Sequence, residues 1–180
     1  SSSNFKTPLP MGEGLGVRLL KQYWGYDTFR GIQEDIINSI TEGRDTLGLM
    51  PTGGGKSITF QVPALAKEGL CLVITPLIAL MKDQVQNLKK RGIKALAIYS
   101  GMSRQEIIVT LENCIFGNFK FLYISPERLD TEIFRTKLQK MKISMITVAR
   151  KPLHIAMGLR LPSCLSEDSR DTHTATRCTR

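Results

Sequence analysis

The sequence predicts an α/β domain built on a doubly wound parallel sheet, on the strength of three observations. Between Leu19 and Val148, short apolar runs alternate with segments of helical periodicity. The apolar runs are continuous, as in strands that are buried on both faces of a parallel sheet. The connections between segments are short, and a helix follows almost every run, which is the order that crossover connections require.

The elements follow in a regular order. The first predicted helix carries isoleucines at helical spacing, at Ile32, Ile36, Ile37 and Ile40. The predicted strands are residues 45–50, 70–75, 95–100, 119–125 and 143–148. The predicted helices between them are residues 57–66, 77–92, 103–114 and 131–141. Ser103 and Glu106 have the spacing of a capping box, which marks the start of the third of these helices.

Both ends of the chain depart from this pattern. Residues 1–18 include PLPMGEGLG, which is too rich in glycine and proline for the interior of an element. Residues 149–180 show no sustained period of two or 3.6. The sequence therefore predicts a leader at 1–18, a domain at 19–148 and a disordered tail at 149–180.

Composition limits the function classes. No apolar run is long enough to span a membrane, and the polar start is not a signal peptide, so a cytoplasmic address is expected. The four cysteines form no CxxC pair, which argues against a metal site or disulfide framework. The net charge of +9 suits a polyanion partner, but solvated basic helices explain it equally well.

The segment MPTGGGKS (50–57) has the context of a phosphate-binding loop, because it follows a predicted strand and opens a predicted helix. Backbone amides in such a loop point at phosphate oxygens, and the helix adds the positive end of its dipole. Lys56 can then reach the β- and γ-phosphates of ATP, and the Ser57 hydroxyl can take a Mg²⁺ position. Met50 stands where the general pattern has its first glycine, so the alternative is a glycine-rich turn with an incidental lysine.

Four segments, in order and spacing, resemble the motifs of RecQ-type DNA helicases of superfamily 2, with the closest likeness to bacterial RecQ enzymes. They are LLKQYWGYDTFRGIQEDII (19–37), MPTGGGKS (50–57), TPLIALMKDQV (75–85) and YISPERL (123–129). The resemblance implies the first part of an incomplete RecA-like motor domain from an ATP- and Mg²⁺-dependent 3′–5′ DNA helicase. Such an enzyme acts in DNA repair and recombination and lies at the bacterial nucleoid. A second RecA-like domain with its arginine finger is expected to be missing from this sequence.

The resemblance also implies residue roles in ATP binding. Tyr26 and Arg30 would stack on the adenine ring and Gln33 would hydrogen-bond its edge. The alternative places Tyr26 and Trp24 in the core as ordinary aromatics. The remaining implied ATP-binding residues are Pro51, Thr52, Gly53, Gly54, Gly55, Lys56 and Ser57, of which Lys56 and Ser57 would be catalytic.

For DNA, the resemblance implies contacts from loops at strand ends. Thr75, Lys82, Ser125 and Arg128 could donate to phosphates of single-stranded or partly duplex DNA. Thr75 and Ser125 also stand at ordinary strand-to-helix junctions, where they could simply cap the next helix.

The catalytic acids of the family are absent. In RecQ-type helicases the strand after YISPERL ends in Asp-Glu-Ala-His, whose acids hold magnesium and prepare the attacking water. This strand is expected beside the one that precedes the phosphate loop, yet here it ends in Ala149, Arg150, Lys151 and Pro152. The chain is therefore expected to bind ATP without cleaving it.

The genetic code offers a reason for the missing acids. One permitted coding of residues 152–163, read in another frame, gives the family's continuation His-Cys-Ile-Ser-Gln-Trp-Gly-Tyr-Asp-Phe-Arg-Pro. The tryptophan codon in that reading is forced, because Met157 is always ATG and Gly158 always begins with G. We interpret the chain from about Ala149 onward as out-of-frame translation of a helicase gene.

Two rival functions are compatible with the sequence. One is a P-loop kinase or small NTPase, against which the adenine segment and the ordered DNA motifs argue. The other is a nucleotide-binding module that uses Lys56 and Ser57 without turnover, which the absent acids favour for this exact chain.

Overall fold

The computed structural model describes residues 14–50, 55–150 and 154–158, with side chains up to residue 149. The helices are α1 (Leu15–Trp24), α2 (Gln33–Thr41), α3 (Lys56–Ala66), α4 (Ile78–Lys90), α5 (Arg104–Phe116) and α6 (Glu132–Leu138), with a short 3₁₀ turn η1 (Pro126–Arg128). The strands are β1 (Thr46–Leu49), β2 (Leu70–Ile74), β3 (Ala95–Ile98), β4 (Phe121–Ile124), β5 (Ile143–Arg150) and β6 (His154–Gly158). Every strand and helix predicted between residues 45 and 148 is present, with ends that differ by a few residues.

The described strands form one sheet in the order β1-β6-β5-β2-β4-β3. β5, β2, β4 and β3 are parallel neighbours, which confirms the predicted parallel sheet. β6 pairs antiparallel with β5 on one side and with β1 on the other. β1 therefore runs in the same direction as the four parallel strands but is separated from them by β6.

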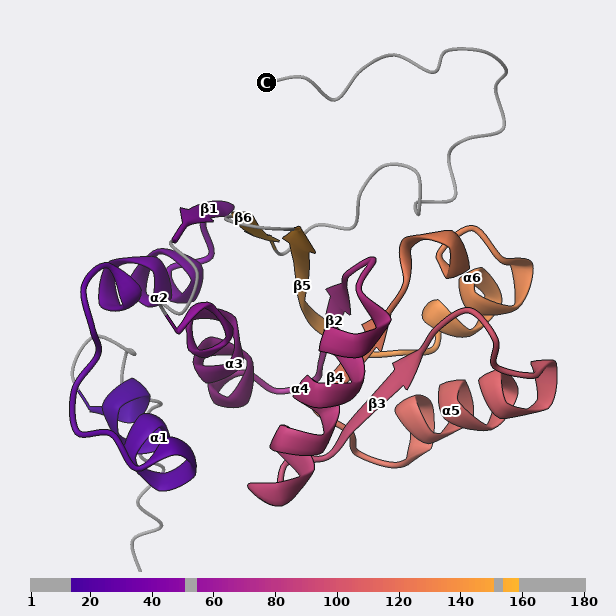
Figure 1. Ribbon diagram of the computed structural model, residues 1–180, viewed down its shortest axis with the longest axis horizontal. Coiled ribbons are helices and arrows are strands. Elements are labelled where there is room, and N and C mark those ends of the chain that lie inside the picture. Colours follow the sequence, from indigo (N-terminus) through magenta and orange to yellow (C-terminus); the bar gives the residue numbers. More distant parts are fainter. Residues whose placement is uncertain (1–13, 51–54, 151–153, 159–180) are drawn as a thin grey trace, which may run out of the picture.

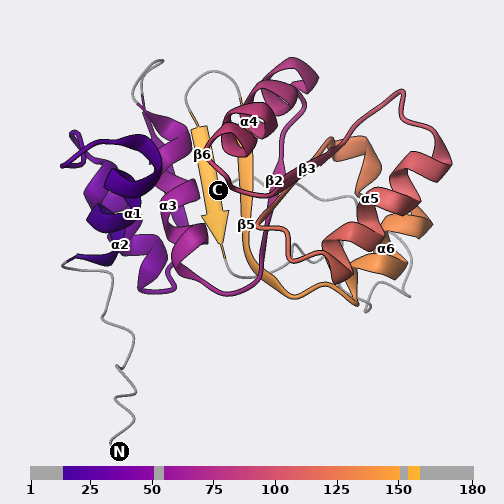
Figure 2. The ribbon, with the colours of Figure 1, turned by 90° about the horizontal axis from the view of Figure 1, so that it is seen from below.

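Helices cover both faces of this sheet, as a doubly wound fold requires. Along β2, Cys71 and Val73 face a core that they share with α2, α3 and α4. The alternate residues Leu70, Leu72 and Ile74 face a second core under α5 and α6. Figures 1 and 2 show the strands between α1–α3 on one side and α5–α6 on the other.

The predicted leader is too long at its C-terminal end. α1 begins at Leu15, so the expectation that residues 1–18 lie outside the elements is wrong for residues 15–18. Gly16 is buried within α1, where an added Cβ atom would make ordinary van der Waals contact with the Phe29 ring at 3.5 Å and with Val62 at 3.8 Å. This glycine therefore lies inside a helix and does not form a turn.

The predicted disordered tail begins too early. β5 continues through Ala149 and Arg150, and β6 adds a strand at 154–158, so the prediction is wrong for these residues. The edge of β5 that faces away from β2 needs backbone partners, and a short segment that follows closely can pair there at low loop-closure cost. Figure 2 shows β6 beside β5. The rest of the predicted tail, residues 151–153 and 159–180, lies outside the described residues.

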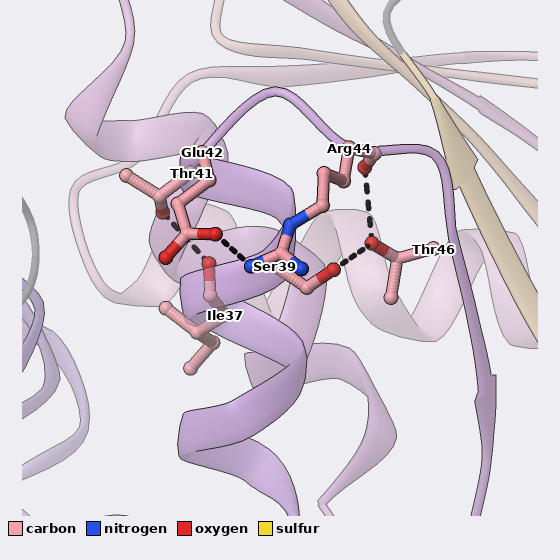
Figure 3. Close-up of polar contacts among 6 residues, drawn as sticks. All are labelled: Ile37, Ser39, Thr41, Glu42, Arg44 and Thr46. Atoms are coloured by element: carbon pink, nitrogen blue, oxygen red, sulfur yellow. Dashed lines mark hydrogen bonds and ion pairs between the residues drawn. The ribbon is translucent and has the colours of Figure 1, made fainter.

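A polar corner joins α2 to β1, the strand that leads to residue 50 (Figure 3). The hydroxyls of Ser39 and Thr46 lie 2.8 Å apart, and the Thr46 hydroxyl also donates to the Arg44 carbonyl at 3.0 Å. The Arg44 guanidinium pairs with Glu42 at the end of α2. These contacts fix the start of β1 against α2.

Candidate nucleotide site

The described part of the MPTGGGKS loop ends in a helix N-terminus. Gly55 adopts a left-handed φ of 69°, and Lys56 and Ser57 are the first two residues of α3. The positive end of the helix dipole makes this end of α3 favourable for a phosphate. The predicted roles of Pro51, Thr52, Gly53 and Gly54 stay predictions, since these residues lie outside the described ranges.

Gln33 connects the predicted adenine segment to this helix start. Its side chain is 3% exposed; Oε1 accepts from the Arg30 backbone N–H at 2.8 Å, and Nε2 donates to the Gly55 carbonyl at 3.2 Å. A Cβ atom on Gly55 would stand 2.3 Å from the Gln33 Nε2 atom. The amide therefore holds the two segments together, while its predicted hydrogen bond to adenine remains a prediction.

Tyr26 and Arg30 lie together on the surface before α2. The Arg30 guanidinium carbon is 5.5 Å from the centroid of the Tyr26 ring, a cation–π distance, and Tyr26 is 48% exposed. The alternative that places Tyr26 in the core is therefore wrong. For Trp24 it holds in part, since this ring is half-buried and packs against the core beside Tyr23.

Ser57 has a hydroxyl that is already oriented by a protein donor. Gln84 Nε2 donates to Ser57 Oγ at 2.5 Å. Within the part of the chain that the structure describes, no group of three or more His, Cys, Asp or Glu side chains could hold a metal ion. Mg²⁺ commonly takes one or two protein oxygens together with substrate phosphates and water. The site therefore fits Mg²⁺ that arrives with a triphosphate, with Ser57 as its protein ligand, and does not fit a resident free ion.

The end of β5 has no carboxylate to add to this ligand set. Ala149 and Arg150 occupy the last two positions of the strand. At this edge of the sheet, His154 of β6 pairs with Leu49 of β1 on one side and with Arg150 of β5 on the other. The expectation that β5 lies directly beside β1 is wrong, because the antiparallel β6 hydrogen-bonds to both.

The four predicted DNA contacts divide into two kinds. Thr75 and Ser125 are each 1% exposed, and the Thr75 hydroxyl accepts from the Leu77 N–H at 3.4 Å. Lys82 is exposed, with its ammonium 4.6 Å from the Tyr99 ring centroid. Arg128 is half-buried and lines a groove of about 570 Å³ between α5 and α6.

Only Lys82 and Arg128 are thus available at the surface as predicted. The burial of Thr75 and its bond to a backbone N–H favour a capping role for that residue. DNA contact by any of the four residues stays a prediction.

Three polar residues near Ser57 were not predicted. Gln61 of α3, Gln84 of α4 and the phenol of Tyr123 on β4 form a hydrogen-bonded group that reaches Ser57. The available signal was weak: Gln61 and Tyr123 are single polar groups within apolar stretches, and Gln84 stands among other polar residues of α4, where one more glutamine gives no signal. Such groups need partners when buried, but the sequence does not say which ones.

Comparison with known proteins places the chain among helicases. Residues 30–148 match the family described as DEAD/DEAH box helicase. The chain is 44% identical over 130 residues to the probable ATP-dependent DNA helicase RecS of Bacillus subtilis. It is 47% identical over 131 residues to the ATP-dependent DNA helicase RecQ of the same organism.

These matches cover 72% of this chain but only 26% of RecS and 22% of RecQ. Among solved structures, a crystal structure of the DUF1998 helicase MrfA bound to DNA and AMPPNP superposes with a TM-score of 0.59. That match covers 75% of this chain and 20% of the other at 18% identity, so it supports the fold alone. No helix in the described ranges is long and apolar enough to cross a membrane.

Proposed function

Because this chain belongs to the DEAD/DEAH box helicase family, we propose that it is the ATP-binding portion of a RecQ-type ATP-dependent DNA helicase. The observation that carries this proposal is the bond from the Gln33 amide to the Gly55 carbonyl, at the start of α3. It joins an exposed aromatic and guanidinium pair to a helix N-terminus, which is the arrangement that a base followed by phosphates requires.

Each residue of the site then has a role. Tyr26 and Arg30 hold the adenine ring, and Gln33 reads its edge. The backbone at Gly55 and the ammonium of Lys56 hold the phosphates, and Ser57 gives an oxygen to Mg²⁺, which neutralises phosphate charge when bound. Lys82 and Arg128 contact the backbone of single-stranded DNA. The cytoplasm, at the bacterial nucleoid, is the place we propose for this activity.

A second candidate is a nucleotide-binding module without turnover. The observation in its favour is the end of β5, where Ala149 and Arg150 supply no carboxylate oxygen to orient water or complete a magnesium site. For this chain as written we favour nucleotide binding without hydrolysis.

The proposal is tested by calorimetric titration of the chain with Mg-ATP and Mg-GTP. Lys56→Ala should weaken ATP binding by about 10- to 150-fold, the range for a hydrogen bond to a charged group. Lys89→Ala, an exposed lysine in the last turn of α4, is the matched control and should leave the affinity unchanged. GTP should bind more weakly than ATP, because guanine presents a reversed donor and acceptor edge to Gln33. Equal affinity for Lys56→Ala and the unmodified chain would contradict the proposal.

A further inference from the structure

We propose that Gln84 is a positioning residue for Mg²⁺-nucleotide binding, which holds the Ser57 hydroxyl in one orientation and is itself held by Gln61 and Tyr123. The inference rests on the proposed function, since that function gives Ser57 its magnesium position. It extends that function to a residue on α4, outside the phosphate loop.

The four side chains form a closed set of hydrogen bonds from three elements. Gln84 Nε2 donates to Ser57 Oγ at 2.5 Å. Gln84 Oε1 accepts from Gln61 Nε2 at 3.0 Å and from the Tyr123 hydroxyl at 2.9 Å. Gln61 Nε2 also lies 3.1 Å from the Tyr123 oxygen. Gln61 and Tyr123 are 4% and 2% exposed, so bulk water competes little for these bonds.

The direction of each bond follows from chemistry. Burial raises the pKa of Tyr123, so its phenol stays protonated and can donate. In the structure Gln61 Nε2 and the Tyr123 phenol both donate to the same atom of Gln84, its carbonyl oxygen. The Gln84 amide nitrogen is therefore the atom that faces Ser57, and it can only donate.

This donor determines what the Ser57 hydroxyl can do. A serine oxygen has two lone pairs and one proton. The Gln84 N–H takes one lone pair, which leaves the second for a metal ion and directs the proton elsewhere. Without Gln84 the hydroxyl could rotate among its staggered positions, and binding of Mg²⁺ would have to select one of them.

The same bonds tie the magnesium position to other parts of the sheet. Ser57 and Gln61 lie on α3, Gln84 on α4, and Tyr123 on β4, whose chain continues to Arg128. Lys82 stands two residues before Gln84 on α4. A ligand that moves α4 or the end of β4 would therefore change the orientation of Ser57, and Mg²⁺ binding would change those elements in return.

The experiment compares the affinity of the full chain for a non-hydrolysable ATP analogue in Mg²⁺ and in EDTA. We define the magnesium factor as the dissociation constant in EDTA divided by the dissociation constant in Mg²⁺. A larger factor means that Mg²⁺ strengthens nucleotide binding more. Gln84→Met keeps the length of the side chain but removes the donor, and it should lower the magnesium factor about three- to tenfold, the range for one neutral hydrogen bond. The affinity in EDTA should stay unchanged, which a general structural defect would not allow.

Two further variants make the result decisive. Asn87→Ala, on the same helix, removes a side-chain amide that donates to Asp83 at 3.2 Å; this variant is the matched control and should keep the magnesium factor. Tyr123→Phe removes one of the two donors to Gln84 and should lower the factor in the same direction by a smaller amount. If Gln84→Met does not fold, the magnesium factor of Tyr123→Phe tests the proposal in its place. In nuclear magnetic resonance spectra, the side-chain amide signals of Gln84 should shift when Mg²⁺ is added to the nucleotide complex.

The outcomes separate the two proposals. A magnesium factor that is unchanged in folded Gln84→Met, or in Tyr123→Phe where Gln84→Met does not fold, overturns this inference and leaves the proposed function standing. An unmodified chain that binds the analogue in neither buffer contradicts the proposed function and the inference with it.

Discussion

Position 55 is constrained twice, by a left-handed backbone and by the amide of Gln33. A Cβ atom there would meet Gln33 Nε2 at 2.3 Å, whereas at Gly92, with a φ of 77°, it would meet nothing within 4 Å. The two glycines thus share backbone geometry but differ in their surroundings. This difference allows backbone strain to be separated from the contact that joins the adenine segment to the phosphate loop.

We expect Gly55→Ala to lower the free energy of unfolding more than Gly92→Ala does. Each should lose about 1–2 kcal/mol because alanine is disfavoured in the left-handed region. Gly55→Ala should lose about 1 kcal/mol more, because Gln33 must give up a buried hydrogen bond. Urea denaturation of both variants measures the difference. Equal losses would mean that the Gln33 contact contributes nothing to stability.

The cysteines of the core give a second expectation at this scale. Burial raises the pKa of the Cys71 and Cys114 thiols from 9.0 to about 12, so the reactive thiolate is scarce in the folded chain. At pH 8, iodoacetamide should leave both unmodified in the native chain and alkylate both in urea. Peptide mapping separates them from Cys164 and Cys178, which lie outside the described residues. Rapid native labelling of Cys71 would contradict the burial of β2.

At the scale of helices and strands, the sequence could predict features that depend on neighbouring residues in the chain. The capping box at Ser103 and Glu106 is present: the Ser103 hydroxyl accepts from the Glu106 N–H at 3.2 Å, and Glu106 accepts from the Ser103 N–H at 2.7 Å. α1 was not predicted as a helix, because its first residues, Leu15 and Gly16, end the stretch PLPMGEGLG, whose glycines and prolines indicate a loop. β6 was missed because its residues, HIAMG, follow Lys151 and Pro152 and include a single β-branched residue, so they lack the continuous apolar run that marks the other strands.

We expect Ser103→Ala to lower the free energy of unfolding by about 1 kcal/mol, the usual cost of losing an N-cap. Ser103→Thr keeps a hydroxyl acceptor and should lose much less.

The bond from the Ser103 N–H lowers the pKa of Glu106 below its ordinary 4.5. The stabilisation from this hydrogen bond is thus fully present above about pH 4.5, and it is lost as the pH falls through the lowered pKa of Glu106. Denaturant titrations at pH 7 and at pH 3 measure both effects, and a Ser103→Ala chain as stable as the unmodified one would contradict this account of the start of α5.

At the scale of the whole molecule, sheet order is the property that sequence could not supply. The alternation of strands and helices predicts a doubly wound sheet, but it does not say which strand neighbours β1. That depends on long-range pairing, and here β6 lies between β1 and β5. The candidate site followed the same division. The place of Lys56 and Ser57 at the start of a helix could be predicted from the loop motif, whereas the contacts of Gln61, Gln84 and Tyr123 depend on how α3, α4 and β4 come together.

We expect the chain to release no phosphate from ATP above background, with or without single-stranded DNA, even where it binds the nucleotide. Ala149 and Arg150 end β5 without an acid to orient water, and a missing general base costs about 100- to 10,000-fold in rate. A phosphate-release assay beside RecQ of Bacillus subtilis provides the comparison. A rate similar to that of RecQ would contradict the assignment of β5 as a strand without catalytic residues.

The out-of-frame origin of the chain from about Ala149 stays a hypothesis. Sequencing the gene through the codons for residues 145–165 tests it directly. Bases that read as Asp-Glu-Ala-His after an insertion or deletion would support it. An uninterrupted frame without those codons would contradict it.

The most direct test of the central claim is to find where ATP sits on the chain. Photolysis of 8-azido-ATP bound to the protein in Mg²⁺, followed by trypsin and mass spectrometry, identifies the segment that contacts the adenine ring. The account predicts label in the tryptic peptides of residues 22–30 and 31–44, which contain Tyr26, Arg30 and Gln33. This label should disappear with excess ATP and in the Lys56→Ala chain. Label confined to other peptides, or label that excess ATP does not remove, would contradict a nucleotide site between Tyr26 and the start of α3.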